Sequence, residues 1–324
     1  MKDKFTILLS EKKIITILCL ISLCYSFLAG SGFYGYSNDY YGYYNQKNLN
    51  YYKWNEFGIV LSTLTINDVN LGVYLTSLFL ALSVGLMLKN FLEIKKNRSL
   101  FFLVFIFVIA LHTHPLIMST SGAMRQGWAM IFIFFSIFYL LIEKKFLSFI
   151  MMTTAMIMHK SGLFFFALYL LMVISSYFLE RIKQKKFFLI FLSFILVIFF
   201  YYVMQLSFFK ETKRNIVGQD FKYHWMIINI IYVFYYFTFY NFIMLLKTKK
   251  VSLFFYYFCL LSPITIFFDF TYSYERLNMM VSIPLILTSL FLFKKRDFYF
   301  SLSFVFFFYL FLTFYQGMYS YGLN

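Results

Sequence analysis

The chain of 324 residues is far more apolar than a soluble protein of its size. Apolar residues make up 62% and charged residues 13%, and the mean hydropathy is +0.75. In an ordinary soluble domain, roughly 45–50% of the residues are apolar and about 25% are charged. A soluble fold cannot cover so much apolar surface, so the composition excludes a soluble enzyme, a disordered chain and a nucleic-acid-binding domain. The net charge of +16 therefore belongs to a polytopic membrane protein.

Apolar runs separated by short charged clusters predict an all-α integral membrane protein with about eleven transmembrane helices and no soluble domain. A bilayer core of about 30 Å needs roughly 20 helical residues, and the runs lack the alternation of barrel strands. We expect one transmembrane domain over residues 1–324, with outer loops near residues 33–57, 119–126, 159–160, 210–224 and 269–276. The predicted crossings are residues 14–32, 69–88, 100–118, 127–142, 146–158, 161–179, 187–209, 225–246, 251–268, 277–293 and 298–315.

Residues 146–179 are predicted to form a hairpin of two short helices. As one helix, this stretch would measure about 51 Å at 1.5 Å per residue, which is too long for a single crossing. Both of its flanks are basic, so both are expected on the cytoplasmic side. Two crossings with His159 and Lys160 at the outer tip satisfy both conditions.

The distribution of Lys and Arg predicts a cytoplasmic N-terminus. With that orientation twenty of the 29 basic residues fall inside, as the positive-inside rule requires, and Trp54, Trp128 and Trp225 fall at the outer boundary. The first apolar run follows Lys12 and Lys13 and resembles a secretory signal. It is long enough to span the membrane, so we interpret it as an uncleaved first helix.

The nine basic residues left on the outer side include the candidates for a binding site. Charge at membrane depth is expensive and usually functional or paired, and the planar fork of Arg suits diphosphates. Arg125 and Arg276 lie at predicted helix ends, and a cluster occupies the loop 210–223. The alternative is that these residues are interfacial anchors with snorkelling side chains. The cluster consists of Lys210, Lys213, Arg214 and Lys222.

Acids and histidines supply further candidates. Asp39 and Glu56 lie in a tyrosine-rich outer loop that could hold a sugar or could form an ordinary aromatic belt. His159 could remove a hydroxyl proton or could be a structural histidine. His112 and His114 flank a helix end before a proline, where capping or packing is favoured over metal binding. We find no ligand set for a divalent metal and expect no cofactor.

Five short motifs resemble, in order, those of the EpsG/Wzy-type family of bacterial polysaccharide polymerases. The late motif, Glu275-Arg276, is similar to the family's arginine-containing segment, whereas Glu56 departs from the family pattern because glycine follows Phe57 instead of preceding it. Each motif alone is weak, but their order and spacing are moderately specific. The others are Asp39-Tyr40, Glu56-Phe57-Gly58, Arg125-Gln126 and His159-Lys160-Ser161.

The resemblance implies a membrane glycosyltransferase that joins oligosaccharide repeats carried on undecaprenyl diphosphate into O-antigen, capsule or exopolysaccharide. It implies donor and acceptor substrates of that class, a lipid bilayer, and a chain-length regulator and a flippase as partner proteins. Arg125 and Arg276 would stabilise the leaving diphosphate, and His159 would be the base. The substrate-binding residues would be Asp39, Tyr40, Glu56, Gln126, Lys160, Lys210, Lys213, Arg214 and Glu275.

Two other functions stay open at this point. A flippase for the lipid-linked repeat would need charges along a path through the helices, whereas here the unmatched charges gather at the predicted outer ends. A glycosyltransferase using a polyprenyl monophosphate sugar would need a catalytic acid in the first outer loop, where only Asp39 and Glu56 could serve.

Overall fold

The structure is a computed structural model that describes residues 11–35, 57, 61, 70–95, 99–182, 185–205, 249–268, 271–290 and 293–315. Over these residues the protein is all-helical, as predicted, and contains no strand. The chain divides into two compact units. Unit 1 comprises residues 1–164 and 293–324, and unit 2 comprises residues 165–292.

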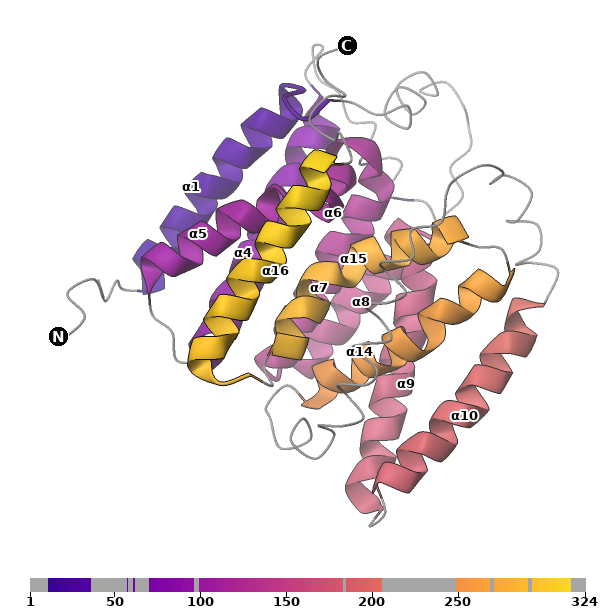
Figure 1. Cartoon of the computed structure of the whole chain (residues 1–324). Helices are drawn as coiled ribbons and strands as arrows, with labels where there is room; N and C mark the ends of the chain where they lie inside the picture. Colours follow the sequence, from indigo (N-terminus) through magenta and orange to yellow (C-terminus); the bar gives the residue numbers. More distant parts are fainter. Residues whose placement is uncertain are drawn as a thin grey trace. The chain divides into compact units, whose positions relative to one another are not determined.

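Unit 1 is a helical bundle that contains most of the motif residues within the described part of the chain (Figure 1). The first residues of α9 (Ser161–Arg181) also belong to it. Its other elements are α1 (Glu11–Gly30), α4 (Leu71–Ile94), α5 (Leu100–Leu111), α6 (His114–Ile117), the π-helix η2 (Met118–Gly122), α7 (Met124–Leu141), α8 (Lys145–Met158) and α16 (Lys295–Tyr315).

Within the described ranges, four helices are long and apolar enough to cross a membrane, namely α1, α4, α7 and α9. A fifth crossing results if α5 and the helix that follows it are one bent span. The 14-residue helix α8 measures about 21 Å and is among the shorter apolar helices. The protein is therefore a multi-helix membrane protein, but the predicted count of eleven crossings is not confirmed, and the predicted crossing 225–246 lies outside the described residues.

Small residues let the helices of unit 1 approach closely, which is how helices associate in lipid. Helix α1 runs beside α4, where Ser26 Oγ donates a hydrogen bond of 2.8 Å to the Tyr74 carbonyl and Gly30 faces the Tyr74 ring. Between α7 and α8, Ser136 and Ser148 each donate to the other's backbone carbonyl at 2.9 Å. Both serines are fully buried, so these bonds fix the register of the antiparallel α7–α8 pair.

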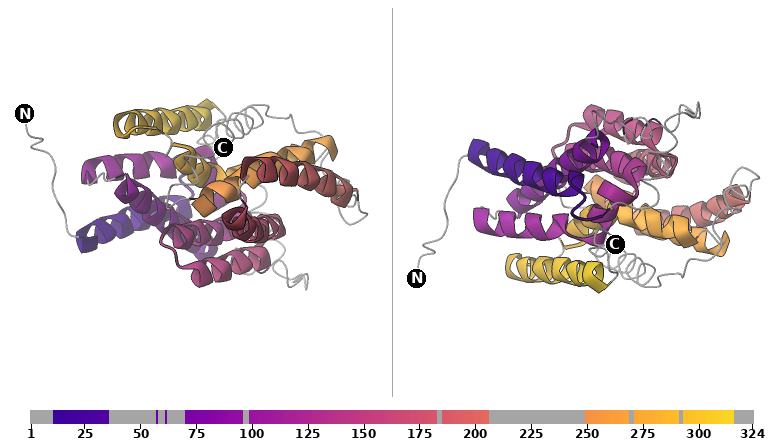
Figure 2. Two further views of the ribbon diagram at one scale, coloured as in Figure 1. Left: turned by 90° about the horizontal axis from the view of Figure 1, so that it is seen from below. Right: turned by 90° about the horizontal axis from the view of Figure 1, so that it is seen from above.

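Aromatic residues join α16 to α5, although the two helices are far apart in the sequence. The Phe102 and Tyr299 rings lie 5.0 Å apart, and those of Phe105 and Phe307 lie 5.8 Å apart. Both views of Figure 2 place α16 next to α5. The outward side of α16 remains apolar, with Phe300 75% exposed, as expected of a helix that faces lipid acyl chains.

The predicted crossing 100–118 is not one continuous helix, because the helix breaks near its C-terminal end. Helix α5 ends at Leu111, Thr113 is extended (φ −79°, ψ 148°), and the chain resumes as α6 and η2 at an angle of 60°. Pro115 has no backbone N–H and clashes with a preceding helical turn, so the proline explains the break. The capping interpretation of His112 is confirmed, since it is the C-cap of α5.

Unit 2 contains the rest of α9, α10 (Lys185–Met204), α14 (Lys249–Leu261), the 3₁₀ helix η4 (Ser262–Phe268) and α15 (Thr271–Ser289). The Phe165 ring on α9 stacks on Phe258 of α14 at 5.7 Å. The hydroxyls of Ser193 on α10 and Tyr256 on α14 are 2.6 Å apart. This buried hydrogen bond and the aromatic contacts hold α14 at the core of the unit.

Candidate functional site

The helices of unit 1 have two ends of very different chemistry. We define the Lys95 end by the start of α1, the end of α4, the turn between α7 and α8, and the start of α16. The opposite end, the Arg125 end, contains the helix break after α5, the start of α7 and the turn between α8 and α9. The predicted loop residues Arg125, Gln126, His159 and Lys160 all fall at the Arg125 end.

Arg125 lies in the first turn of α7, immediately after the π-helix η2. The N-cap residue Ala123 offers no side-chain hydrogen bond, and Arg125 is half-buried there while its neighbour Gln126 is only 3% exposed. Backbone N–H groups and the positive end of the helix dipole gather at such a helix start. Together with the guanidinium, they make this position favourable for an anionic group.

Gly127 explains why α7 begins at this place. A Cβ atom built on Gly127 would lie 2.0 Å from the Ser119 carbonyl oxygen and 2.9 Å from Thr76 Cγ2. Only glycine allows α7 to pass so close to the η2 backbone and to α4. The fixed crossing point of these three elements sets the position of Arg125, two residues earlier.

The helix break beside this site is stabilised by a buried tyrosine. The Tyr34 hydroxyl and His112 Nε2 are 2.9 Å apart, and His112 Nδ1 is 2.8 Å from the Val108 carbonyl oxygen. A carbonyl can only accept, so Nδ1 carries the hydrogen and the Tyr34 hydroxyl donates to Nε2. Tyr34 is 2% exposed, and through it the chain segment after α1 is attached to the end of α5.

His159 occupies the turn between α8 and α9, as the predicted hairpin requires. Its Nδ1 atom lies 2.5 Å from Ser161 Oγ and accepts the Ser161 backbone N–H at 3.2 Å. The imidazole thus accepts a hydrogen bond from one of the first N–H groups of α9, which have no acceptor within the helix. Gly162 makes the tight turn possible, because a Cβ there would meet the Ala155 carbonyl oxygen at 2.1 Å.

Arg125 and His159 lie at the same height of the α7–α8 pair. Arg125 comes eleven residues before Ser136 on α7, and His159 comes eleven residues after Ser148 on α8. Because the two serines are hydrogen-bonded to each other, both residues lie about 16 Å from the same point at 1.5 Å per residue. The sequence motifs that contain them, 34 positions apart, therefore lie at the same end of unit 1.

The remaining predicted site residues are placed as follows. Glu275 and Arg276 lie in the first turns of α15 in unit 2, where Arg276 is half-buried. Lys160 is exposed at the tip of the hairpin. The others lie outside the described residues: Asp39, Tyr40, Glu56, Lys210, Lys213 and Arg214.

No group of three or more His, Cys, Asp or Glu side chains that could hold a metal ion occurs within the described residues. The two histidines of the helix break do not form one, because His112 is engaged with Tyr34 and Val108. The charged groups described at the Arg125 end are cationic, namely Arg125 and Lys160. This arrangement can bind and stabilise negative charge.

Three positioning interactions were missed at the sequence level. Ser161 was part of a recognised motif but had no role, and the Tyr34–His112 contact joins positions 78 residues apart. Only the serine pair had a usable signal, because Ser136 and Ser148 are isolated polar residues in apolar runs, and such residues commonly bond across helices in lipid.

The fold and the site together define a polytopic α-helical membrane protein with a cationic polar end. Comparison with protein-family models matches the EpsG family over residues 14–323. The chain therefore belongs to the EpsG family, as the order of its motifs indicated. Comparisons with curated proteins and with solved structures give no match.

Proposed function

We propose that this protein is a polysaccharide polymerase that joins undecaprenyl-diphosphate-linked oligosaccharide repeats. Membership of the EpsG family supports a polymerase-like membrane glycosyltransferase. The observation that carries the proposal further is the common height of Arg125 and His159 on the α7–α8 pair, which the Ser136–Ser148 bonds fix. On this support we propose that one substrate contacts both the Arg125 guanidinium and the His159 imidazole of these two family-like motifs.

The proposed orientation puts the Arg125 end on the outer face of the inner membrane, with the N-terminus in the cytoplasm. Nine described Lys and Arg residues of unit 1 lie at the Lys95 end, whereas two lie at the Arg125 end. Cytoplasmic segments carry the excess of Lys and Arg. The nine are Lys12, Lys13, Lys89, Lys95, Lys144, Lys145, Lys294, Lys295 and Arg296.

In the proposed reaction, a hydroxyl oxygen of the acceptor repeat attacks C1 of the donor's reducing-end sugar. The bond from C1 to the diphosphate oxygen breaks, and its electron pair leaves with undecaprenyl diphosphate. Arg125 and Arg276 stabilise the charge that develops on the diphosphate, which is the largest contribution expected of such groups. The hydroxyl proton passes to a base, for which His159, Asp39 and Glu56 are the candidates.

The other predicted residues complete the proposal. Gln126 and Glu275, next to the two arginines in sequence, would bind polar groups of the substrate, as would Tyr40 and Lys160. The basic cluster Lys210, Lys213 and Arg214 would attract the anionic carrier lipid. The cationic side chains take the place of a divalent metal, so polymerisation should persist in a chelator, and its loss would contradict this part. A chain-length regulator and a flippase are the proposed partner proteins.

The proposal is tested by profiling surface polysaccharide in a strain that lacks the gene. A polymerase predicts single-repeat decoration without a ladder, restored by the wild-type gene and not by R125A or R276A. Retained laddering in the deletion strain would overturn the proposal.

One observation favours a lipid-linked oligosaccharide flippase as the alternative. The 60° break between α5 and α6 resembles the discontinuous helices of transporters. A flippase predicts that the deletion strain makes no decoration at all and accumulates lipid-linked repeats on the inner leaflet. The same profiling experiment therefore separates the two functions.

A further inference from the structure

We infer that His159 acts as a neutral hydrogen-bond donor to the substrate diphosphate through Nε2, and that Ser161 is the positioning residue that fixes this form of the ring. The inference rests on the proposed function and assigns a role within the same site. It differs from the expectation that His159 is the base.

The backbone geometry decides which ring nitrogen carries the hydrogen. The Ser161 N–H points at His159 Nδ1 at 3.2 Å, and a backbone N–H can only donate. Nδ1 must therefore present its lone pair, and the Ser161 hydroxyl at 2.5 Å donates to the same lone pair. A neutral imidazole with an accepting Nδ1 carries its hydrogen on Nε2.

The surrounding turn holds this arrangement in place. His159 is extended (φ −157°, ψ 146°) where α8 ends, and its carbonyl oxygen accepts the Gly162 N–H at 2.8 Å. Gly162 lets the start of α9 pack directly against the Ala155 carbonyl, which keeps Ser161 next to the ring. Moving the hydrogen to Nδ1 would place it against the Ser161 N–H, so the turn disfavours both the other tautomer and the imidazolium.

The consequence for the reaction is a division of roles. A ring with its hydrogen on Nε2 cannot accept the acceptor hydroxyl's proton there, but it can donate to an oxygen of the diphosphate. Arg125 lies at the same height on the neighbouring helix and supplies positive charge to the same group. The proton that leaves the acceptor hydroxyl then passes to a carboxylate, Asp39 or Glu56.

Two substitutions of His159 separate the possible roles. H159Q places an amide N–H donor near the position of Nε2, so we expect polymerisation within about tenfold of wild type. H159N keeps an oxygen near the position of Nδ1 that can accept the Ser161 N–H, as Asn does at helix N-caps, but it has no donor at Nε2. We expect H159N to lower the rate by about 10²-fold or more, as for the loss of one preorganised donor.

The assay uses the full-length protein in proteoliposomes, with the lipid-linked oligosaccharide pool extracted from the deletion strain as the probe. Membrane levels and gel-filtration profiles in detergent confirm folding of each variant. His159 would be the base if both variants lose most of their activity and their residual rates no longer show the fall in rate below pH ~6.5 that the wild type shows. Full activity of H159N would show that the ring only caps α9; either result overturns the inference.

Ser161 is tested in the same assay. S161A leaves the backbone N–H in place and removes the hydroxyl, so we expect a several-fold lower rate, recovered by S161T. An S161A rate equal to wild type would overturn the positioning role. If the wild-type protein does not extend the probe at all, the proposed function itself fails, whereas a functional wild type with inactive H159Q removes only the donor role.

Discussion

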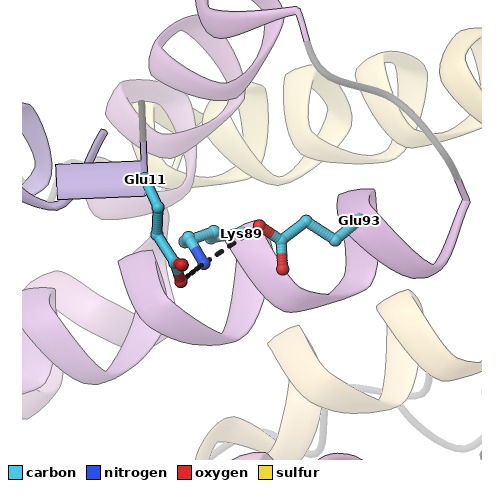
Figure 3. A network of polar contacts seen from close by, with 3 residues as sticks. All are labelled: Glu11, Lys89 and Glu93. Carbon is cyan, nitrogen blue, oxygen red and sulfur yellow. Dashed lines mark hydrogen bonds and ion pairs between the residues drawn. The ribbon is translucent and has the colours of Figure 1, made fainter. Parts of the chain in front are cut away.

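The two ends of unit 1 differ more in how their charged side chains are surrounded than in the presence of charge itself. At the Lys95 end, Lys89 donates to Glu11 at 2.8 Å and to Glu93 at 2.9 Å, and both carboxylates are largely exposed (Figure 3). At the Arg125 end the structure describes only two Lys and Arg residues, and one of them, Arg125, is half-buried beside the closely packed η2 backbone and the buried Gln126. Exposed pairs contribute little, whereas charge beside a desolvated, rigid framework interacts strongly.

The largest difference between the ends should appear on removal of Arg125. R125A should lower the polymerisation rate by about 10²–10³-fold, the usual effect of losing one group that stabilises developing charge. R125K should give an intermediate rate, because lysine keeps the charge without the bidentate fork. The rate is measured by ladder formation at matched membrane levels.

The matched control is R296A, which removes an exposed arginine at the Lys95 end. Its rate should stay within about twofold of wild type, since exposed charges contribute little. Equal losses in R125A and R296A would mean that the two ends do not differ in function.

The second prediction concerns the framework that positions Arg125. In G127A the new Cβ would meet the Ser119 carbonyl oxygen at 2.0 Å. Because this neighbour is backbone and not a flexible side chain, the loss of stability should reach about 3 kcal/mol, the upper end of the usual range for overpacking. G85A is the control, since the nearest atoms to its Cβ would belong to side chains, the Phe107 ring at 3.0 Å and Leu18 Cδ2 at 3.4 Å. Thermal unfolding in detergent should rank wild type, G85A and G127A in that order, and a G127A midpoint equal to that of G85A would contradict the close packing at the start of α7.

The third prediction uses pH to examine the Lys95 end. Lys95 Nζ donates to the Phe293 carbonyl at 2.9 Å and lies 5.0 Å from the centre of the Phe298 ring, and burial lowers the pKa of Lys95 to about 8. The unfolded chain holds this proton up to about pH 10.4, so between these values the unfolded state binds more protons. Stability should therefore rise with pH from about 8 to about 10.4.

Thermal midpoints of wild type and K95M across this range provide the measurement. K95M should lack the rise, while K12M, which removes an exposed lysine of α1, should retain it. If the thermal midpoint of K95M rises with pH as that of the wild type does, the rise is caused by a titratable group other than Lys95.

The smallest effect is expected from the ion pairs in Figure 3. K89M should lower the thermal midpoint slightly, because the Lys89 side chain is 11% exposed but its partners are 71% and 52% exposed. The difference from wild type should shrink at high salt, which screens exposed charges. Polymerisation should be unchanged, and a loss of activity in K89M would show that the Lys95 end takes part in the function.

Much of the architecture follows from composition and charge, because these patterns extend over many residues. The all-helical membrane class, the hairpin at His159 and the segregation of Lys and Arg each depend on many residues acting together. Residues 100–118 were nevertheless predicted as one crossing, because their average hydropathy is high despite His112, Thr113 and His114, and an average does not register the local effect of Pro115. A proline within such a run was the signal that could have placed it.

For the candidate site, motif order proposes residues and not their geometry. It selects Arg125 and His159 as candidates, but the hydrogen on His159 depends on the direction of one backbone N–H, which no sequence pattern encodes. The serine pair that aligns the two motifs depends on the register between α7 and α8, a property of packing. Asp39 and Glu56 stay predictions, because they lie outside the described residues.

The equal spacing of the two motifs from the serine pair makes chain length within α7 and α8 a constraint of its own. The apolar residues between Arg125 and Ser136 can change identity and still face lipid or a neighbouring helix. One inserted residue would instead turn Arg125 by about 100° around α7 and raise it by about 1.5 Å, away from His159. Sequence drift in these helices should thus be tolerated through substitution, whereas a change of length on one helix alone would misalign the two motifs.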